Sequence, residues 1–108
     1  MNKHERFMRL AELAARKSTS RVRMGAVLVD GSRPIAIGIN DMSRTHPLFY
    51  PANIHAELDA VLSAPYTVGT SIYVVRLLRN GDRALAAPCK RCMGLLAKRG
   101  IKKIWFSP

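Results

Sequence analysis

The chain has 108 residues, the size of one compact domain, and 48% of them are hydrophobic, as in ordinary globular proteins. No apolar run approaches the roughly 20 residues that a membrane-spanning helix needs, and residues 1–6 lack the apolar stretch of a secretory signal. These features exclude a disordered or membrane-bound protein. We therefore expect one soluble, cytoplasmic domain over residues 1–108.

The charge is strongly basic, with 18 lysines and arginines against seven acidic residues and a formal net charge of +11. Such an excess indicates an anionic partner, and nucleic acid and phosphorylated substrates are the obvious classes. Nine of the basic residues lie in residues 1–50 and nine in residues 51–108, so they are dispersed. A dispersed excess is also what a merely soluble surface carries, and the charge alone leaves the partner open.

The first half of the chain predicts a helix followed by a hairpin. Apolar residues at helical spacing, such as Phe7 and Ala11, predict an amphipathic helix over residues 4–17. Short apolar runs at 25–29 and 35–39 predict two strands, joined by turn residues at 30–34. Residues 40–53 are expected to form a long loop that holds Phe49 and Tyr50.

The second half predicts alternating helices and strands. A helix is expected over 54–63, a β-branched strand over 70–78 and an extended connection over 82–87. Pro88 suits the first position of a helix that continues through Lys98 and stops at Gly100. A last strand is expected over 101–106. This order predicts an α/β fold whose mixed sheet has an antiparallel first hairpin and later parallel strands.

Two short motifs carry the chemistry of the chain. His55-Ala56-Glu57 is followed by Pro88-Cys89-Lys90-Arg91-Cys92, and these two cysteines are the only ones in the sequence. One imidazole and two thiols are a natural ligand set for a zinc ion whose fourth position stays open. A carboxylate beside such a metal, here Glu57, is suited to proton transfer. The motifs therefore favour a catalytic metal site.

Other uses of the cysteines have to be weighed against the metal. The pair could form a disulfide or a redox centre, or hold structural zinc. A c-type haem would require histidine after the second cysteine, where the chain has Met93. A redox centre of the thioredoxin type would follow the first strand of the chain, and this motif comes late in it. Structural zinc would not require a neighbouring carboxylate.

The expected helices give the ligands their positions. Cys89 and Cys92 are three residues apart in a first helical turn, where free N–H groups and the helix dipole favour thiolates. His55 also begins a helix. Two helix N-termini facing each other at the ends of adjacent parallel strands would bring the three ligands together. His55 and Glu57 lie about 200° apart on a regular helix, so the spacing does not require them to converge.

With these motifs, the chain resembles the cytidine/deoxycytidylate deaminase superfamily, which includes tRNA adenosine deaminases and polynucleotide cytosine deaminases. The likeness covers nearly the whole chain and includes Met24-Gly25-Ala26-Val27, Gly38-Ile39-Asn40 and Gly100-Ile101-Lys102-Lys103-Ile104. The paired motifs are specific to this superfamily, and the other segments are weaker support. The resemblance implies a three-layer α/β/α fold of the cytidine deaminase type.

The resemblance also implies the roles of individual residues. His55, Cys89 and Cys92 would bind one Zn²⁺ per chain, and Glu57 would transfer protons during hydrolytic removal of an amino group. The remaining expected roles concern substrate. Asn40 would contact its sugar or base, although a simple turn residue is the alternative, and the backbone at Ala56 and Ala87 would hydrogen-bond the edge of the base.

The departures from the family pattern concern the substrate. The tRNA adenosine deaminases have glutamate where this chain has Ala87, and its long connection over residues 79–87 looks more like that of enzymes acting on cytidine. The first hypothesis is therefore conversion of cytosine to uracil in a (deoxy)cytidine nucleoside or nucleotide such as dCMP. Family members usually continue beyond the fourth strand, so a homo-oligomer could supply a missing wall or contact.

Two alternatives remain. The net charge favours a deaminase that acts on cytosine or adenine in single-stranded DNA or RNA, whereas an aromatic content of 6% offers few stacking surfaces for bases. Phe49 and Tyr50 could stack on a base or simply pack in their loop. A non-catalytic, nucleic-acid-binding zinc protein is the third hypothesis, and Glu57 argues against it because structural zinc does not need that carboxylate.

Overall fold

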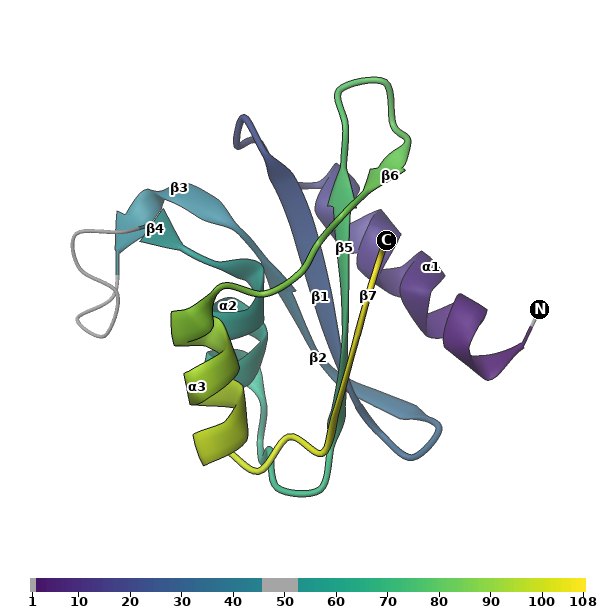
Figure 1. Ribbon diagram of the computed structural model, residues 1–108, viewed down its shortest axis with the longest axis vertical. Coiled ribbons are helices and arrows are strands. Elements are labelled where there is room, and N and C mark those ends of the chain that lie inside the picture. Colours follow the sequence, from purple (N-terminus) through teal and green to yellow (C-terminus); the bar gives the residue numbers. More distant parts are fainter. Residues whose placement is uncertain (1, 46–52) are drawn as a thin grey trace.

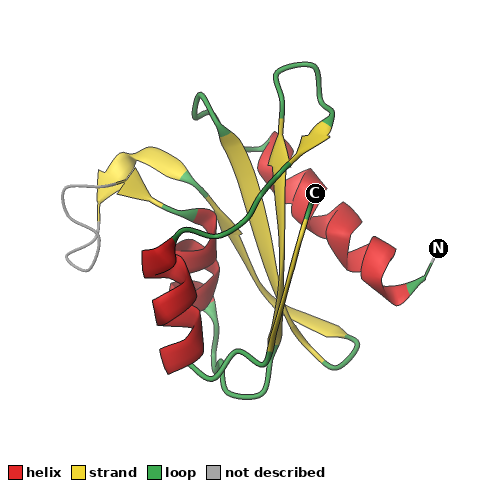
Figure 2. Ribbon diagram, viewed as in Figure 1, coloured by secondary structure: helices red, strands yellow, loops and turns green. Residues whose placement is uncertain are grey.

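A computed structural model describes residues 2–45 and 53–108 (Figures 1 and 2). One mixed sheet lies between helices, and a two-stranded sheet projects beside it. The elements in chain order are α1 (Lys3–Arg16), β1 (Arg23–Asp30), β2 (Arg33–Ile39), β3 (Asp41–Thr45), β4 (Asn53–Ile54), α2 (Ala56–Ser63), β5 (Ser71–Leu77), β6 (Arg83–Ala84), α3 (Lys90–Lys98) and β7 (Lys103–Phe106).

The main sheet is centred on β1 and β5. The strands run in the order β2-β1-β5, and all of these neighbours are antiparallel. The other edge of β5 is shared, because β7 pairs in parallel with its first half and β6 pairs antiparallel with its end. The expected mixed sheet, with an antiparallel hairpin and a later parallel pair, is therefore confirmed.

Helix α1 covers one face of this sheet. Asn2 caps it, since the Asn2 side chain accepts a hydrogen bond from the Glu5 N–H at 2.8 Å. The apolar side of the helix, with Phe7 and Ala11, packs on alternate residues of β1 and β5. A Cβ atom at Gly25 would lie 2.2 Å from the Ala11 carbonyl oxygen, so glycine lets α1 approach β1 at backbone distance.

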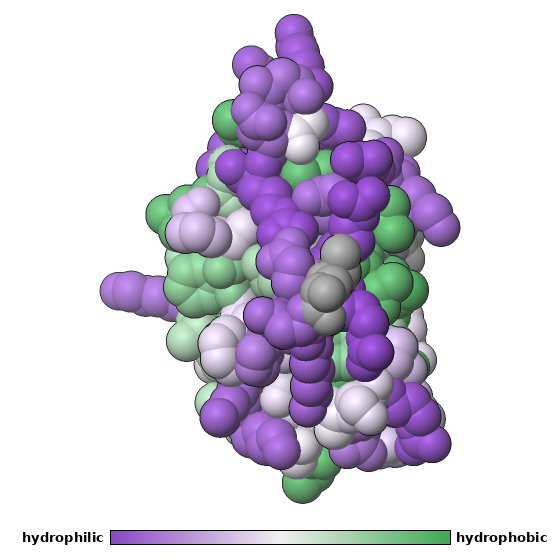
Figure 3. Space-filling view, turned by 90° about the vertical axis from the view of Figure 1, so that its right-hand side faces the viewer, coloured by the Kyte–Doolittle hydropathy of each residue, from purple (hydrophilic) through white to green (hydrophobic). Residues whose placement is uncertain are grey.

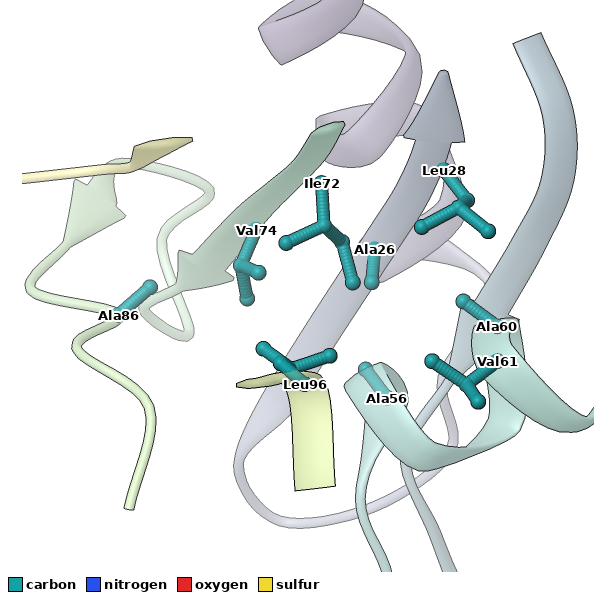
Figure 4. Close-up of a cluster of buried hydrophobic side chains, with 9 residues drawn as sticks. All are labelled: Ala26, Leu28, Ala56, Ala60, Val61, Ile72, Val74, Ala86 and Leu96. Atoms are coloured by element: carbon teal, nitrogen blue, oxygen red, sulfur yellow. The ribbon is translucent and has the colours of Figure 1, made fainter. Parts of the chain in front are cut away.

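Helices α2 and α3 cover the opposite face, which completes the three layers. The core there is built from small and branched side chains that converge from the strands and the two helices (Figure 4): Ala26, Leu28, Ala56, Ala60, Val61, Ile72, Val74, Ala86 and Leu96. At Gly38 a Cβ atom would lie 2.1 Å from the Ala56 carbonyl oxygen. Glycine in β2 therefore allows the start of α2 to rest directly on the sheet.

The predicted order of the main helices and strands is confirmed, with differences at their ends. Residues 40–53, expected to be a loop, contain β3 and end in β4, and these two short strands pair with each other. Helix α2 begins at Ala56, two residues later than expected, because Ile54 belongs to β4 and His55 is the N-cap of the helix. Phe49 and Tyr50 lie outside the described residues. None of the described helices is long and apolar enough to cross a membrane.

Two expectations about the helix starts are wrong. Pro88 precedes the N-cap of α3, whose first helical residue is Lys90, so the proline does not occupy the first position. The strands that lead towards α2 and α3 are not adjacent either. β1 separates β2 from β5, and the two helices meet instead by packing on one sheet face, where Leu58 of α2 contacts Cys92 of α3.

Candidate metal centre

His55 occupies the N-cap of α2. Its backbone is extended, with φ −85° and ψ 155°, and its carbonyl accepts the Asp59 N–H at 3.0 Å, as the first hydrogen bond of a helix requires. The extended ψ directs the imidazole away from the helix axis and against the cysteine side chains. A residue at an N-cap is thus fixed by the helix while its side chain remains outside the helical surface.

The two cysteines open α3. Cys89 is its N-cap, and its sulfur accepts the Cys92 N–H at 3.4 Å, so the helix start itself supplies a hydrogen bond that a thiolate favours. Cys89 is exposed, whereas Cys92 is fully buried against Leu58. One sulfur therefore faces the outside, and the other is anchored in the contact between the two helices.

The three predicted ligands come together. His55 Nδ1 lies 3.1 Å from Cys92 Sγ and 3.6 Å from Cys89 Sγ, and all three atoms lie within 4.8 Å of one another. Zinc bonds of about 2.0 Å to nitrogen and 2.3 Å to sulfur place tetrahedral ligands roughly 3.5 Å apart. The donor set and its spacing therefore fit one zinc ion, and three protein ligands leave a fourth position.

Glu57 lies beside this group of three ligands. The carboxyl is only 2% exposed, and among the residues that the structure describes its Oε1 atom has no hydrogen-bond partner. Burial raises the pKa of Glu57 above its ordinary value, against smaller lowering effects of its own backbone N–H, His55 and Cys92. These two side-chain interactions indicate that Glu57 lies close to His55 and Cys92, a convergence that spacing alone left open.

The Cys92 thiol lies where a further negative charge is disfavoured. Burial raises its pKa, and the neighbouring Glu57 and Cys89 raise it further because each disfavours another negative charge. The helix start was expected to favour a thiolate at this position. Without a metal, desolvation outweighs that effect at Cys92. A divalent cation between the sulfurs and the carboxylate would reverse the balance by neutralising the negative charge.

Asn40 lies at the end of β2, and its side chain is engaged within the chain. Its Oδ1 atom accepts the Met24 N–H and the Ser18 hydroxyl, both at 2.8 Å, and its Nδ2 atom donates to the Val22 carbonyl. These bonds fasten the segment between α1 and β1 to the end of β2. The expected contact between Asn40 and substrate stays a prediction.

The other two predicted substrate positions lie beside the metal ligands along the chain. Ala56 is the first residue of α2 and is buried on Gly38. Ala87 is exposed in the connection between β6 and α3, two residues before Cys89. Their backbone contacts with a base also remain predictions.

Two residues that support the site were not identified from the sequence. Asp59 accepts the Ile39 N–H at 2.9 Å and so joins α2 to β2. Ser107 is fully buried, and its hydroxyl donates to the Ala84 carbonyl at 2.6 Å while its carbonyl accepts the Ala86 N–H at 2.9 Å. An acidic residue in a first helical turn was a weak signal for Asp59. Nothing in the sequence distinguished Ser107.

Residues 1–107 match the family model described as the cytidine and deoxycytidylate deaminase zinc-binding region. No curated protein matches the chain in sequence. Among solved structures, the apo dCMP deaminase of cyanophage S-TIM5 superposes with a TM-score of 0.73 and 25% identity, covering 95% of this chain and 80% of that one.

Two further solved structures share the fold. A mutant cytidine deaminase from Mycobacterium tuberculosis has a TM-score of 0.64 and 21% identity, and the match covers 96% of this chain and 84% of that one. A guanine deaminase from Bacillus subtilis has a TM-score of 0.69 and 24% identity, with 99% and 64% of the two chains covered. The three-layer fold is thus one on which deaminases of different bases are built.

Proposed function

This chain belongs to the cytidine and deoxycytidylate deaminase zinc-binding family, and from that membership we propose that it hydrolytically converts cytosine to uracil in a (deoxy)cytidine nucleoside or nucleotide such as dCMP. The observation that carries the proposal is the buried Glu57 carboxyl, whose Oε1 atom has no partner in the described chain, beside the triad of His55, Cys89 and Cys92. A site that only held structural zinc would not require this carboxyl.

The metal and the Glu57 carboxyl are proposed to have different roles in the reaction. His55, Cys89 and Cys92 would hold the zinc ion, which would supply a Lewis acid able to lower the pKa of water to about 7. Glu57 takes one proton from the attacking water and delivers it to the ring nitrogen. It then takes the remaining proton from the hydroxyl group added to the ring carbon and delivers it to the amino group, so that ammonia leaves as the carbonyl forms. Because Glu57 is almost fully buried, bulk water is kept away from the proton that it carries.

Three positions are proposed to hold the substrate. The backbone at Ala56 and Ala87 hydrogen-bonds the edge of the base, since both residues flank the metal ligands along the chain. Asn40 contacts the sugar or base. Its Nδ2 atom donates a hydrogen bond to the Val22 carbonyl, and an amide nitrogen has a second hydrogen to offer.

Cytosine in a free nucleotide is favoured over adenine in RNA by the residues around the second motif. Ala87 stands where the tRNA adenosine deaminases have glutamate, and the connection between β5 and α3 is long. A structure of the cyanophage dCMP deaminase in complex with dCMP and dUMP shares the fold, with a TM-score of 0.70 and 23% identity, over 94% of this chain and 78% of that one. The basic surface suits a phosphate-bearing substrate.

A second candidate function is deamination of single-stranded nucleic acid, which the net charge of +11 favours. A homo-oligomer is part of either proposal. It is supported by Leu85 and Phe106, which are large, apolar and exposed near the free edge of the sheet. Light scattering on the purified chain measures the oligomer directly.

The test is a direct assay of amino-group loss by the zinc-loaded protein. We expect dCMP or cytidine to lose ammonia and give the uracil product, with the metal content at one zinc per chain. Turnover of single-stranded oligonucleotides alone would overturn the free-nucleotide proposal in favour of the second candidate. Full zinc occupancy without turnover of any cytosine or adenine substrate would indicate a non-catalytic zinc protein.

A further inference from the structure

A second cavity lies away from the metal centre, on the α1 face of the sheet. It has a volume of about 270 Å³, near the lower limit for small-ligand pockets, and is formed where α1 begins beside β5 and β7. Its lining residues are Lys3, His4, Val29, Gly31, Ser71, Tyr73, Lys102, Lys103 and Trp105. The metal ligands lie on the other face, under α2 and α3, so the two sites are separate.

The lining carries positive charge and no acidic side chain. Lys3 is the first residue of α1, Lys103 is the first residue of β7 and Lys102 precedes it, so three lysines line the cavity from two parts of the fold. Within residues 2–45 and 53–108, these three groups form neither an ion pair nor a hydrogen bond. The start of α1 adds the partial positive charge of a helix N-terminus. Figure 3 shows hydrophilic side chains gathered along this side of the molecule.

An aromatic surface adjoins the lysines. Lys103 and Trp105 are two residues apart on β7 and therefore point to the same face of the sheet. The Trp105 indole is held by His4, whose ring centroid is 4.3 Å away, and by a stacked Tyr73 at 6.1 Å. His4 is fixed in turn by a 2.7 Å hydrogen bond between its Nδ1 and the Tyr73 hydroxyl. This support leaves the indole 37% exposed beside the cavity.

Unneutralised ammonium groups and a rigid, exposed indole are the two features that recognise a phosphate and a base. A solvated basic surface would not need a cavity or an immobilised aromatic ring. We propose that this cavity binds a nucleotide unit, with its phosphate on Lys3, Lys102 and Lys103 and its base against Trp105. The unit is either a free nucleotide or one residue of a single-stranded polynucleotide. Binding here does not depend on the deaminase reaction.

Trp105 is the only tryptophan in the chain, so intrinsic fluorescence reports on this cavity directly. The zinc-loaded protein is titrated with dAMP, with deoxyadenosine, and with a single-stranded oligonucleotide. We expect a saturable change in fluorescence with dAMP or the oligonucleotide, a weaker response to deoxyadenosine, and competition by inorganic phosphate. Response to the oligonucleotide alone identifies a polynucleotide as the source, and response to dAMP identifies a free nucleotide.

Charge-matched variants separate the cavity from the surface as a whole. The double variant Lys102→Ala/Lys103→Ala should weaken binding roughly tenfold or more, since hydrogen bonds to charged groups are lost. Lys17→Ala/Lys98→Ala removes the same charge from exposed positions outside the cavity and should change affinity less than twofold. Lys3→Ala provides an independent test on a different element. Trp105→Phe, followed by calorimetry, should weaken binding of dAMP or the oligonucleotide more than that of phosphate.

Three results would overturn the proposal. One is the absence of a saturable response to both dAMP and the oligonucleotide. Another is an equal loss of affinity in the two double-lysine variants, which would mean that general surface charge binds the ligand. The third is an affinity for deoxyadenosine equal to that for dAMP. None of these results bears on deamination, which the amino-group assay measures separately at the metal centre.

Discussion

At the scale of single residues, the metal centre depends on what an N-cap position does to a side chain. His55 and Cys89 are both N-caps with extended backbone, so their side chains lie outside the regular helical surface. For this reason the angular separation of about 200° that applies to two residues inside a helix does not apply to His55 and Glu57. The cap, rather than the helix, lets the imidazole and the carboxyl share one site.

Replacement of Glu57 by glutamine should abolish turnover while the metal stays bound. Glutamine keeps the size of the side chain but cannot carry a proton between water and the ring, so we expect the rate to fall by at least about 10²-fold. Metal analysis should still find one zinc per chain, because the three ligands are untouched.

Cys92→Ser is the matched control, since it removes a ligand and should lower zinc content and activity together. A Glu57→Gln protein that deaminates at the normal rate would show that another group transfers the protons. Loss of zinc in Glu57→Gln would instead give the carboxyl a structural role at the site.

At the scale of elements, two glycines set how closely the helices approach the sheet. Gly38 brings the start of α2, and with it His55, onto β2, and Gly25 does the same for α1 on β1. The Asp59 carboxylate then fixes α2 against the Ile39 N–H. The metal ligand on α2 is thus placed by the backbone distance between a helix and a strand.

Gly38→Ala should destabilise the fold and disturb the metal centre. The added Cβ would lie 2.1 Å from the Ala56 carbonyl oxygen, a contact that only a shift of α2 can relieve, at a cost of about 1–3 kcal/mol. Because His55 moves with α2, zinc affinity should fall as well. Chemical unfolding with bound zinc measured in parallel checks both effects.

Gly94→Ala makes the same chemical change within α3, where an added Cβ meets nothing within 4 Å. It should raise stability by roughly 0.5–1 kcal/mol, because alanine is the better helix former. Equal effects of the two substitutions would contradict the close packing of α2 on β2.

Much of the site could be predicted from the sequence because its chemistry lies in short motifs. His55, Cys89 and Cys92 were identified as one ligand set from residue type and spacing, and the structure brings them together. The convergence of Glu57 followed from the family resemblance and could not be predicted from spacing, since it depends on the dihedral angles of one cap residue.

The residues that support the site could not be predicted from the sequence either. Ser107 binds Ala84 and Ala86 across a gap of more than 20 residues, and such distant pairings leave no local pattern. β3 and β4 were not predicted for a related reason, since both strands are short and are stabilised mainly by pairing with each other. The alternating order of the main elements was predictable because hydrophobic periodicity is local.

At the scale of the whole molecule, an ionic cluster connects the first helix with the segment that leads to the cysteines. Arg83, in β6, donates from Nε to Glu12 at 2.8 Å and from its terminal nitrogen to Glu5 at 2.9 Å. Glu12 is also paired with Arg16 at 3.1 Å. These contacts join α1 to β6, the short strand that pairs with the end of β5.

This cluster makes stability depend on pH in acid. Burial acts to raise the pKa of Glu12, but the hydrogen bond and charge of Arg83, together with Arg16 and Arg9, outweigh it and leave the pKa below its ordinary value. A carboxyl whose pKa is lowered by folding stabilises the fold above its unfolded pKa of about 4.3. That contribution is lost as the pH falls through the lower, folded value.

Glu12→Gln should therefore lower the melting temperature at pH 7. At pH 3 the difference in melting temperature between the variant and the unaltered protein should be smaller. Glu5→Gln is the control, because this more exposed partner of Arg83 contributes little. Calorimetric melting curves at the two pH values provide the comparison. A difference in melting temperature that stays constant from pH 7 to pH 3 would show that ionisation of Glu12 does not stabilise the fold.

The hydrogen bonds of Ser107 set an order of events during synthesis of the chain. His55, Cys89 and Cys92 all leave the ribosome before residue 107, when the pairing of β6 with β5 can form but the hydrogen bonds of Ser107 to Ala84 and Ala86 cannot. We therefore expect the segment that leads to the cysteines to reach its final position late in synthesis. A nascent chain stalled before residue 107 would carry every ligand and still lack these hydrogen bonds.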